Sequence, residues 1–426
     1  MKLSLLAIAA ENHVIPEKIF DGVCSYWAEV TAEKTVIIPS VSCEKWEGIF
    51  SSACVLRVGE GSEEGTDALP MADALKKAEG KEEVFVCGDI HFVEQYWERF
   101  DCIYLSRVHC DMEGECCFPL PDRKNWYEKS RILNWTDAHC FSNIIYQREP
   151  LGLSVSVVLS TCNQSAWLEK TLWGYEAQTS RDFELIIADD GSRKDTYEMI
   201  EAIRPHLSYP VKHVWHEDKG FRKCDILNKA ILASGTDYLL FSDGDCIPRN
   251  DFVAVHLKKR QKGRFLSGGY HKLPEAVSKA ITKEDIFSGK CFDISWLKAL
   301  GMRDSFKNNK LTSFGFKAWL LNTITTTRPT WNGHNASGWL TDILAANGFD
   351  ERMQYGGQDR EFGERLENSG IRGKQIRYSA ICVHLEHPRA YKTADSIQKN
   401  LSIRKYTRRK NIKRTPYGIV KNVRFY

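Results

Sequence analysis

An apolar run that ends in two acidic residues constrains the fold of this chain more than any other feature. Residues 237–242 read Asp-Tyr-Leu-Leu-Phe-Ser, and Asp243-Gly244-Asp245 follows directly. Consecutive apolar positions predict a strand that is buried on both faces, as in the centre of a parallel sheet. Such sheets bind their ligands beyond the carboxyl ends of the strands. The two carboxylates are therefore expected at a binding site.

Asp243 and Asp245 are candidate ligands for a hard divalent cation. Oxygen ligands suit Mg²⁺ or Mn²⁺, and such a cation neutralises a diphosphate and makes it a better leaving group. Acidic turns after strands are also common as solvated loops, so this pair alone does not decide between a metal site and a surface turn.

Upstream of this run the chain reads as strand, helix and strand. Strands are predicted from Ser154 to Thr161 and over 183–189, with a helix over 167–178 between them. The second strand ends in Asp189-Asp190-Gly191-Ser192. A further segment, residues 216–222, reads His-Glu-Asp-Lys-Gly-Phe-Arg and precedes a predicted helix over 224–234.

Two downstream segments also place polar residues where elements begin or end. Residues 355–362 read Tyr-Gly-Gly-Gln-Asp-Arg-Glu-Phe and open a predicted helix that ends near Gly370. Residues 380–385 predict an apolar strand, and two histidines stand at its end, His384 and His387.

Together these five segments, spread over residues 154–391, resemble family-2 glycosyltransferases of the GT-A fold. The C-terminal part is similar to galactosyltransferases and chondroitin-type polymerases. The resemblance implies an α/β fold and the inverting transfer of a sugar from a nucleotide-diphosphate donor, expected to be a UDP-sugar, to a glycan or glycolipid, as in lipopolysaccharide or capsule biosynthesis. The donor-binding residues that it implies are Thr161, Asn163, Asp189, Asp190, Lys219, Gly220, Arg222, Asn228 and Asp243.

The resemblance also implies a metal site and a general base. Asp243, Asp245 and His384 would hold Mn²⁺ or Mg²⁺, with His387 as the alternative histidine, and Asp359 would remove the proton from the acceptor hydroxyl. The family has a glutamate before that aspartate, and this chain has Gln358, which leaves the choice of acceptor open.

Each of these assignments has a structural alternative. The Asp189-Asp190 turn can cap a helix, and Lys219 and Arg222 can solvate a loop. Asp359 can stabilise the first turn of its helix through the helix dipole, and a histidine at the end of a strand is often only hydrogen-bonded. Four tryptophans can stack on sugar rings or pack in the core: Trp296, Trp319, Trp331 and Trp339.

Residues 1–149 resemble dihydrofolate reductase in segments 12–15, 34–38, 46–49, 84–89, 101–108 and 118–119. The positions that carry the reductase's chemistry differ. Val23 stands near the place of the pterin-binding carboxylate, with Asp21 on a shifted register, and Pro39 replaces a glycine. The glycine pair that admits the cofactor diphosphate is Gly88-Asp89, which sets a negative charge against phosphate. We expect a reductase-like fold without reductase activity, and its role (docking, acceptor positioning or oligomerisation) stays open.

The sequence predicts domains at 1–149 and 153–391, with Pro150 and Gly152 between them, and a basic tail at 392–426. The 14 cysteines show no paired metal spacing and are expected to be reduced thiols in a cytoplasmic protein. No stretch approaches the about 18 apolar residues that span a bilayer.

The predicted tail is strongly basic, with 11 Lys or Arg and one acid, Asp395, which leaves 48 minus 55, or −7, for the rest of the chain. It can attract the anionic inner face of a membrane or pack on the protein's own acidic surface. No nucleic-acid motif accompanies the charge.

Two alternatives to a transferase remain: an inactive scaffold that binds a nucleotide sugar, and a bifunctional protein with a residual NADPH-dependent reductase.

Overall fold

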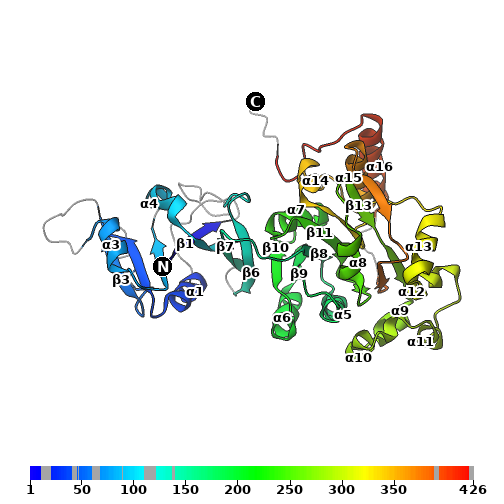
Figure 1. Ribbon diagram of the computed structural model, residues 1–426, viewed down its shortest axis with the longest axis horizontal. Coiled ribbons are helices and arrows are strands. Elements are labelled where there is room, and N and C mark those ends of the chain that lie inside the picture. The colour runs from blue at the N-terminus through cyan, green and yellow to red at the C-terminus, as the bar shows by residue number, and fades with distance from the viewer. Residues whose placement is uncertain are drawn as a thin grey trace. The chain divides into compact units, whose positions relative to one another are not determined.

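The computed structural model describes residues 1–10, 21–40, 46, 48–59, 68–88, 90–109, 121–136, 140–387 and 393–421. They form two compact units, Met1–Leu151 and Gly152–Tyr426 (Figure 1). Each unit has its own seven-stranded sheet, so the chain is an α/β protein with two separate cores.

The sheet of the first unit has the strand order β3-β2-β4-β1-β5-β7-β6. Its first five strands pair in parallel, and β7 pairs antiparallel with both β5 and β6. The elements are β1 (Lys2–Ala10), α1 (Asp21–Thr31), β2 (Thr35–Pro39), β3 (Cys54–Val58), α3 (Met71–Lys77), β4 (Glu83–Cys87), α4 (Ile90–Tyr96), β5 (Cys102–Val108), β6 (Tyr127–Trp135) and β7 (Cys140–Gln147).

Several positions of the reductase resemblance fall on this sheet and its first helix. Val23 is fully buried on α1, whereas Asp21 is exposed at the start of the same helix. Pro39 ends β2, and a Cβ on Gly88 would lie 2.7 Å from the Phe92 ring. Asp89 and the segments 12–15 and 118–119 lie outside the described residues.

The second unit has a mixed sheet of order β10-β9-β8-β11-β15-β13-β16 and a small sheet of order β12-β17-β14. Its strands are β8 (Val155–Thr161), β9 (Phe183–Asp189), β10 (Val211–Trp215), β11 (Tyr238–Asp243), β12 (Cys246–Pro248), β13 (Arg264–Ser267), β14 (Gly269–Lys272), β15 (Ala336–Trp339), β16 (Arg372–Gln375) and β17 (Ile381–His384). Its helices are α5 (Ser165–Glu176), α6 (Lys194–Ile203), α7 (Lys223–Ala233), α8 (Phe252–Lys259), α9 (Glu275–Ala280), α10 (Lys283–Phe287), α11 (Ile294–Ala299), α12 (Asn309–Thr312), α13 (Gly315–Ile324), α14 (Leu340–Ala345), α15 (Gln358–Asn368) and α16 (Ala394–Arg409).

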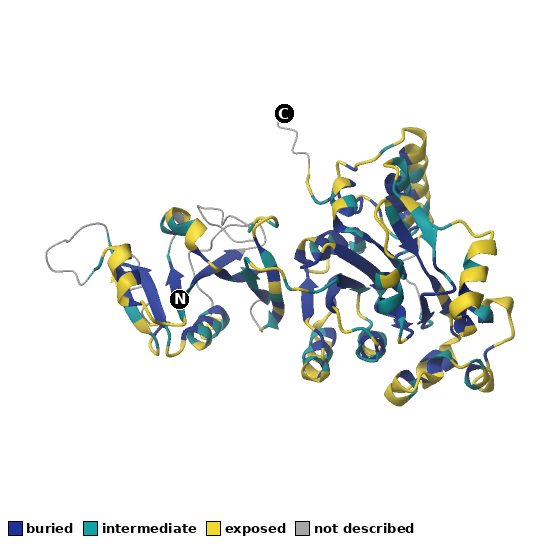
Figure 2. Ribbon diagram, viewed as in Figure 1, coloured by how far each residue is buried: buried dark blue, intermediate teal, exposed yellow. Residues whose placement is uncertain are grey.

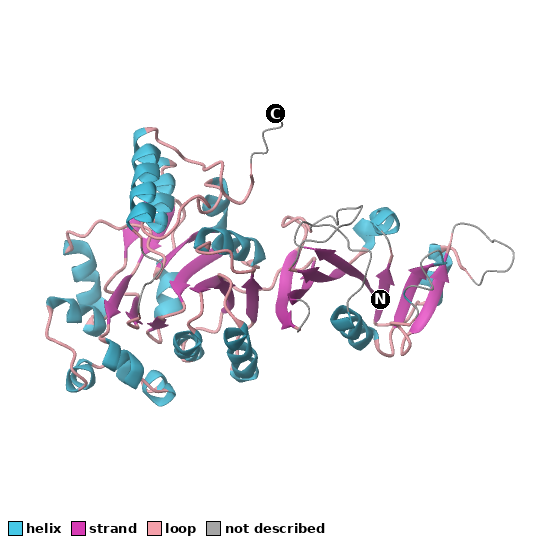
Figure 3. Ribbon diagram, turned by 180° about the vertical axis from the view of Figure 1, so that it is seen from behind, coloured by secondary structure: helices cyan, strands magenta, loops and turns pink. Residues whose placement is uncertain are grey.

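Both faces of this second sheet are buried, because helices lie on each of them (Figures 2 and 3). Alternate residues of one strand enter different cores: Val157 and Leu159 of β8 pack with α5, and Val158 packs with α7. The apolar run of β11 is shared in the same way, with Leu240 on one face and Leu239 on the other. This explains why these strands are apolar at consecutive positions.

The predicted central strand is β11, but the sheet around it is not purely parallel. It pairs in parallel with β8 and antiparallel with β15, the first strand on its other side. The adjacent strands β10, β9, β8 and β11 all run in parallel, as do β13 and β16 beyond β15. The carboxyl ends of the first four therefore meet at one edge, where Thr161, Asp189 and Asp243 stand.

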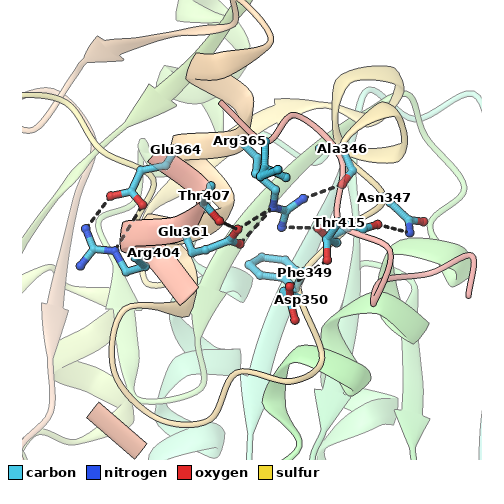
Figure 4. Close-up of polar contacts among 12 residues, drawn as sticks. Ala346, Asn347, Phe349, Asp350, Glu361, Glu364, Arg365, Arg404, Thr407 and Thr415 are labelled. Atoms are coloured by element: carbon cyan, nitrogen blue, oxygen red, sulfur yellow. Dashed lines mark hydrogen bonds and ion pairs between the residues drawn. The ribbon is translucent and has the colours of Figure 1, made fainter. Parts of the chain in front are cut away.

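The region expected to be a basic tail folds onto this unit as helix α16 and the segment after it. Arg404 pairs with Glu364 of α15 at 2.6 Å, and the Thr407 hydroxyl donates to Glu361 at 2.8 Å (Figure 4). Part of the basic charge is therefore paired within the unit. Among the described helices, none is long and apolar enough to cross a membrane.

Candidate active site

A cavity of about 720 Å³ opens at the carboxyl ends of β8, β11 and β17. Its wall collects residues from all the segments that the sequence singled out. The lining residues are Ser160, Thr161, Cys162, Asn163, Gln164, Asp190, Asp218, Gly220, Phe221, Lys223, Asp243, Gly244, Asp245, Tyr270, Lys272, His334, Tyr355, Gln358, Asp359, His384 and His387.

Asp243 is held as a carboxylate by two donors. The Ser160 hydroxyl and the Lys223 ammonium each lie 2.7 Å from its Oδ1 atom. Burial alone would raise the pKa of Asp243, but Lys223 outweighs burial and holds the pKa well below its usual range. Burial would likewise lower the pKa of Lys223, and Asp243 and Asp359 raise it instead. Both groups are charged at neutral pH.

Asp245, two residues further on, faces two histidines from the end of β17. Its Oδ2 atom lies 2.7 Å from His387 Nε2 and 3.5 Å from His384 Nε2. The strand after Asp245, β12, pairs with β17 in the small sheet, where Cys246 stands opposite His384. A carboxylate and two imidazoles thus converge on one side of the cavity.

This donor set fits a divalent cation. Ligand atoms of Asp245, Cys246 and His384 lie within 4.8 Å of one another, but Cys246 is fully buried and does not line the cavity. Burial also raises the pKa of its thiol, and a protonated thiol is a poor ligand. The cavity-lining His387 is a better third donor.

Asp359 lies in the first turn of α15 and faces the same cavity. Its Oδ1 atom is buried and has no hydrogen-bond partner among the residues that the structure describes. Burial raises the pKa of this carboxyl group, and Lys223 opposes that shift. A Cβ on Gly333 would lie 2.8 Å from Asp359 Oδ1, so a glycine there leaves room for the carboxylate. Gln358 also lines the cavity, and its side-chain oxygen accepts from the Gly356 amide at 3.0 Å.

The loops after β8 and β9 meet at the opposite wall. Asp190 accepts from the backbone amide of Arg222 at 3.0 Å, and its other oxygen lies 2.7 Å from His216 Nε2. Gly191 has φ +79°, and a Cβ there would lie 2.6 Å from the Asp218 backbone. Asp218 follows β10, so the close approach of the loops after β9 and β10 requires glycine at position 191. Asn163, which lines the cavity, adopts φ +51°.

Four residues expected at the donor site do not line this cavity as the structure describes it. Asp189 turns inward, where its carboxylate lies 2.9 Å from His213 Nε2 and accepts from the Ser192 amide. Lys219 is exposed and lies 3.2 Å from Glu217.

The other two are tied to protein groups. The Arg222 guanidinium donates to Asp225, one turn further along α7. Asn228 is buried, donates to the Phe349 carbonyl and accepts from the Phe349 amide, and so braces the loop that precedes α15. These four side chains support the loops around the cavity without lining it. Of the four residues, only Arg222 contacts a cavity-lining carboxylate, and it does so through its backbone amide.

Several cavity residues escaped the sequence analysis, among them Lys223, His334 and Tyr270. His334 lies against the Tyr270 ring, with ring centroids 4.3 Å apart, and burial lowers its pKa to about 4. The four tryptophans do not line the cavity: Trp331 is fully buried in the core, and Trp319 is 55% exposed elsewhere. The ten cysteines that the structure describes are free thiols.

Comparison with known proteins gives a family for the segment that builds most of this cavity. Residues 156–316 match the family model described as glycosyl transferase family 2. A chondroitin synthase of Escherichia coli is 26% identical over 67% of this chain and 42% of that protein. An uncharacterized glycosyltransferase of Bacillus subtilis, YfnE, is 24% identical over 59% of this chain and 69% of that protein.

A third relative, a validoxylamine A glucosyltransferase of Streptomyces hygroscopicus, is 25% identical over 51% of this chain and 52% of that protein. This chain thus spans less than half of the chondroitin synthase. Among solved structures, a dihydrofolate reductase from Enterococcus faecalis matches 35% of this chain and 96% of that chain, with 18% identity and a TM-score of 0.31. That likeness is too weak to carry an argument. Residues 156–316 of the second unit, by contrast, match the family-2 glycosyltransferase model, and these three relatives are glycosyltransferases or a synthase of chondroitin.

Proposed function

We propose that the second unit transfers a sugar from a UDP-sugar to the hydroxyl group of a glycan or glycolipid, with inversion at the anomeric carbon and with a divalent cation. The observation that carries this proposal is one cavity whose wall holds Asp243, Asp245, two histidines and Asp359. Departure of the diphosphate needs the metal-binding residues of this set, and attack by the acceptor hydroxyl needs the base, Asp359. Cytoplasmic location and a role in polysaccharide biosynthesis are part of the same proposal.

Asp245, His384 and His387 would hold the cation, which would offset the charge that develops on the leaving diphosphate. Imidazole ligands suit Mn²⁺ better than Mg²⁺, which prefers oxygen ligands and retains water. We therefore favour Mn²⁺. Asp243 stays ionised beside Lys223 and is available to the ribose or the cation.

Thr161, Asn163, Asp190 and Gly220 line the side of the cavity expected to receive the nucleoside. The Thr161 hydroxyl oxygen is buried and has no hydrogen-bond partner among the described residues, so it offers a polar contact to a ligand. Asp189, Lys219, Arg222 and Asn228 would then act by shaping the loops.

Asp359 would accept the proton of the acceptor hydroxyl. Its Oδ1 atom lacks a partner among the described residues, and a buried carboxylate with a raised pKa is a stronger base than one in water. A single displacement through an oxocarbenium-like transition state follows, by analogy with inverting glycosidases.

The decisive experiment measures UDP release from a panel of UDP-sugars with Mn²⁺ or with EDTA. We expect hydrolysis of one donor with Mn²⁺ only, lost in Asp245→Ala. The control is Glu198→Gln, which changes an exposed carboxylate of α6 outside the cavity and should keep Mn²⁺-dependent UDP binding. Metal-dependent UDP binding without turnover on any donor or acceptor would favour a scaffold, and absence of UDP binding would overturn the donor site. Oxidation of NADPH with a pteridine would show a working reductase in the first unit.

A further inference from the structure

Helix α13 has its large apolar side chains on the face that points away from the domain. Ala318 is buried, and Asn322 donates to the Ser379 hydroxyl at 2.9 Å and accepts from the Tyr378 amide at 3.0 Å. These two residues, four apart, are the inward face of the helix. Small and polar side chains therefore anchor α13, which reverses the usual arrangement of a surface helix.

The outward face carries Phe316, Trp319, Leu320 and Ile324, whose spacing of three, four and eight residues places them on one side of the helix. Phe316 is 73% exposed, Trp319 55% and Ile324 62%. The rings of Phe316 and Trp319 lie 5.4 Å apart. Figure 2 shows α13 and the loops around it as largely exposed.

Two more aromatic side chains precede the helix and extend this surface. Phe306 is 71% exposed, and Phe314 is 56% exposed although the Arg249 guanidinium covers one side of its ring at 4.1 Å. We define the α13 patch as Phe306, Phe314, Phe316, Trp319, Leu320 and Ile324. Large apolar surfaces of this kind mark interaction sites on soluble proteins.

The charge around the α13 patch is one-sided. Residues 303–328 contain five basic side chains and one acid, Asp304, which pairs with Lys298 at 2.6 Å. Arg328 pairs with Glu367 at 2.9 Å and Lys310 is buried, which leaves Arg303, Lys307 and Lys317 as exposed bases. The exposed bases Lys307 and Lys317 each stand next to a phenylalanine of the patch. Exposed Trp, Phe and Ile flanked by Lys and Arg are typical of segments that lie in the interface of an anionic lipid surface.

The α13 patch is also linked to the cavity wall. Lys310 of α12 donates to the Tyr270 carbonyl at 2.9 Å, and its ammonium lies 5.4 Å from the centroid of the Tyr270 ring, which lines the cavity. Arg249, which contacts Phe314, follows Asp245 by four residues. The patch therefore adjoins stretches of chain that also carry cavity-lining residues.

We propose that the α13 patch docks this protein on an anionic lipid surface, with the apolar side chains inserted between headgroups and the basic side chains beside the lipid phosphates. The docking does not depend on the transfer reaction. It assigns lipid contact to α13 rather than to the basic C-terminal segment.

The test is co-sedimentation of the full chain with vesicles of phosphatidylglycerol and phosphatidylcholine in equal parts, and with phosphatidylcholine alone. Phe316→Ser/Trp319→Ser changes the patch, and Leu401→Ser/Tyr406→Ser is the matched control, because it removes two exposed apolar side chains from the basic helix α16. We expect the patch variant to lose about tenfold or more in partition to the anionic vesicles and the control to be unchanged.

Equal binding by the patch variant and the wild type, or equal loss in both variants, would overturn the proposal. A dimer in analytical ultracentrifugation that only the patch variant loses, without vesicle binding, would also overturn it and identify a second copy as the occupant. Mn²⁺-dependent UDP binding, measured on the same samples, separates the two proposals. Vesicle binding without UDP binding would leave the docking surface intact and refute the transferase assignment. UDP binding without vesicle binding would refute the docking surface and leave the transferase assignment intact.

Discussion

Replacement of Arg365 by methionine should destabilise the second unit by about 4 kcal/mol. Arg365 and Glu361 are both fully buried, and the guanidinium Nε lies 3.0 Å from each carboxylate oxygen (Figure 4). The same guanidinium donates to the carbonyls of Ala346 and Gly348. Removing it leaves a buried carboxylate without its ion pair, whose cost is about 3–5 kcal/mol in such pairs. Solvent does not screen this pair.

A control on the same two helices separates burial from charge. Arg404 and Glu364 pair across α15 and α16 but are partly exposed, so Arg404→Met should cost less than about 1 kcal/mol. In Glu361→Leu/Arg365→Met the orphaned charge is gone, and the remaining cost is that of two carbonyls and the Thr407 hydroxyl left without partners, about 1 kcal/mol each.

Scanning calorimetry of the full chain measures these differences. A loss of about 4 kcal/mol should lower the Tm of the second unit by about 10 °C, while the transition of the first unit should stay in place. Burial raises the pKa of Glu361, so the Arg365→Met penalty should shrink as the pH falls and the carboxyl group is protonated. A double variant less stable than Arg365→Met, or equal costs for Arg365→Met and Arg404→Met, would refute this reasoning.

Three other predictions concern the cavity. Asp359→Asn should abolish turnover but spare UDP binding, and near-full activity would contradict the role as base. Because the folded-state pKa of Asp359 is raised, ionisation of this group costs stability as the pH rises through that pKa. The variant should therefore have a higher Tm than the wild type at neutral pH. Lys223→Met should shift the acidic limb of the kcat/KM profile to higher pH, because the ammonium that restrains the Asp359 pKa is gone, and an unmoved limb would show that the two groups are not coupled. Asn400→Ala should lower kcat more than UDP affinity, since its amide donates to the carbonyls of Gln354 and Gly356 beside the Asp359 helix; an equal loss in both would indicate a general structural role.

Much of the cavity was predictable because its residues stand at the ends of apolar strands. Asp243, Asp245 and His384 follow runs that can only be buried strands, and the edge of the sheet then brings them together. Asp359 was singled out through a resemblance, and its helix α15, Gln358–Asn368, begins inside the segment 355–362 that was expected to open a helix. Patterns of this kind predict where each strand ends, and the ends of parallel strands lie at one edge of the sheet, where the cavity is.

The same patterns did not tell which neighbouring side chain points inward. Arg222 and Lys223 are adjacent in sequence, and either can face a diphosphate. At the start of α7 the Arg222 guanidinium turns to Asp225, whereas the Lys223 ammonium reaches Asp243. Neighbouring residues on a helix diverge by about 100°, so a shift of one position decides the outcome. Asp189 and Asp190 divide in the same way between His213 in the core and the cavity.

Charge counted along the sequence does not show how much of that charge is available to a membrane. In the basic C-terminal segment, Arg404 pairs with Glu364 of α15, 40 residues upstream, and this partner becomes visible only when α16 is packed in place. Each such ion pair lowers the positive charge that is available to an anionic surface, because an already neutralised charge adds little to the attraction. Around α13, Arg328 pairs with Glu367 and Lys310 is buried, which leaves Arg303, Lys307 and Lys317 as exposed bases near the apolar side chains. Net charge of a segment is therefore a poor guide to membrane contact unless the internal pairs are first subtracted.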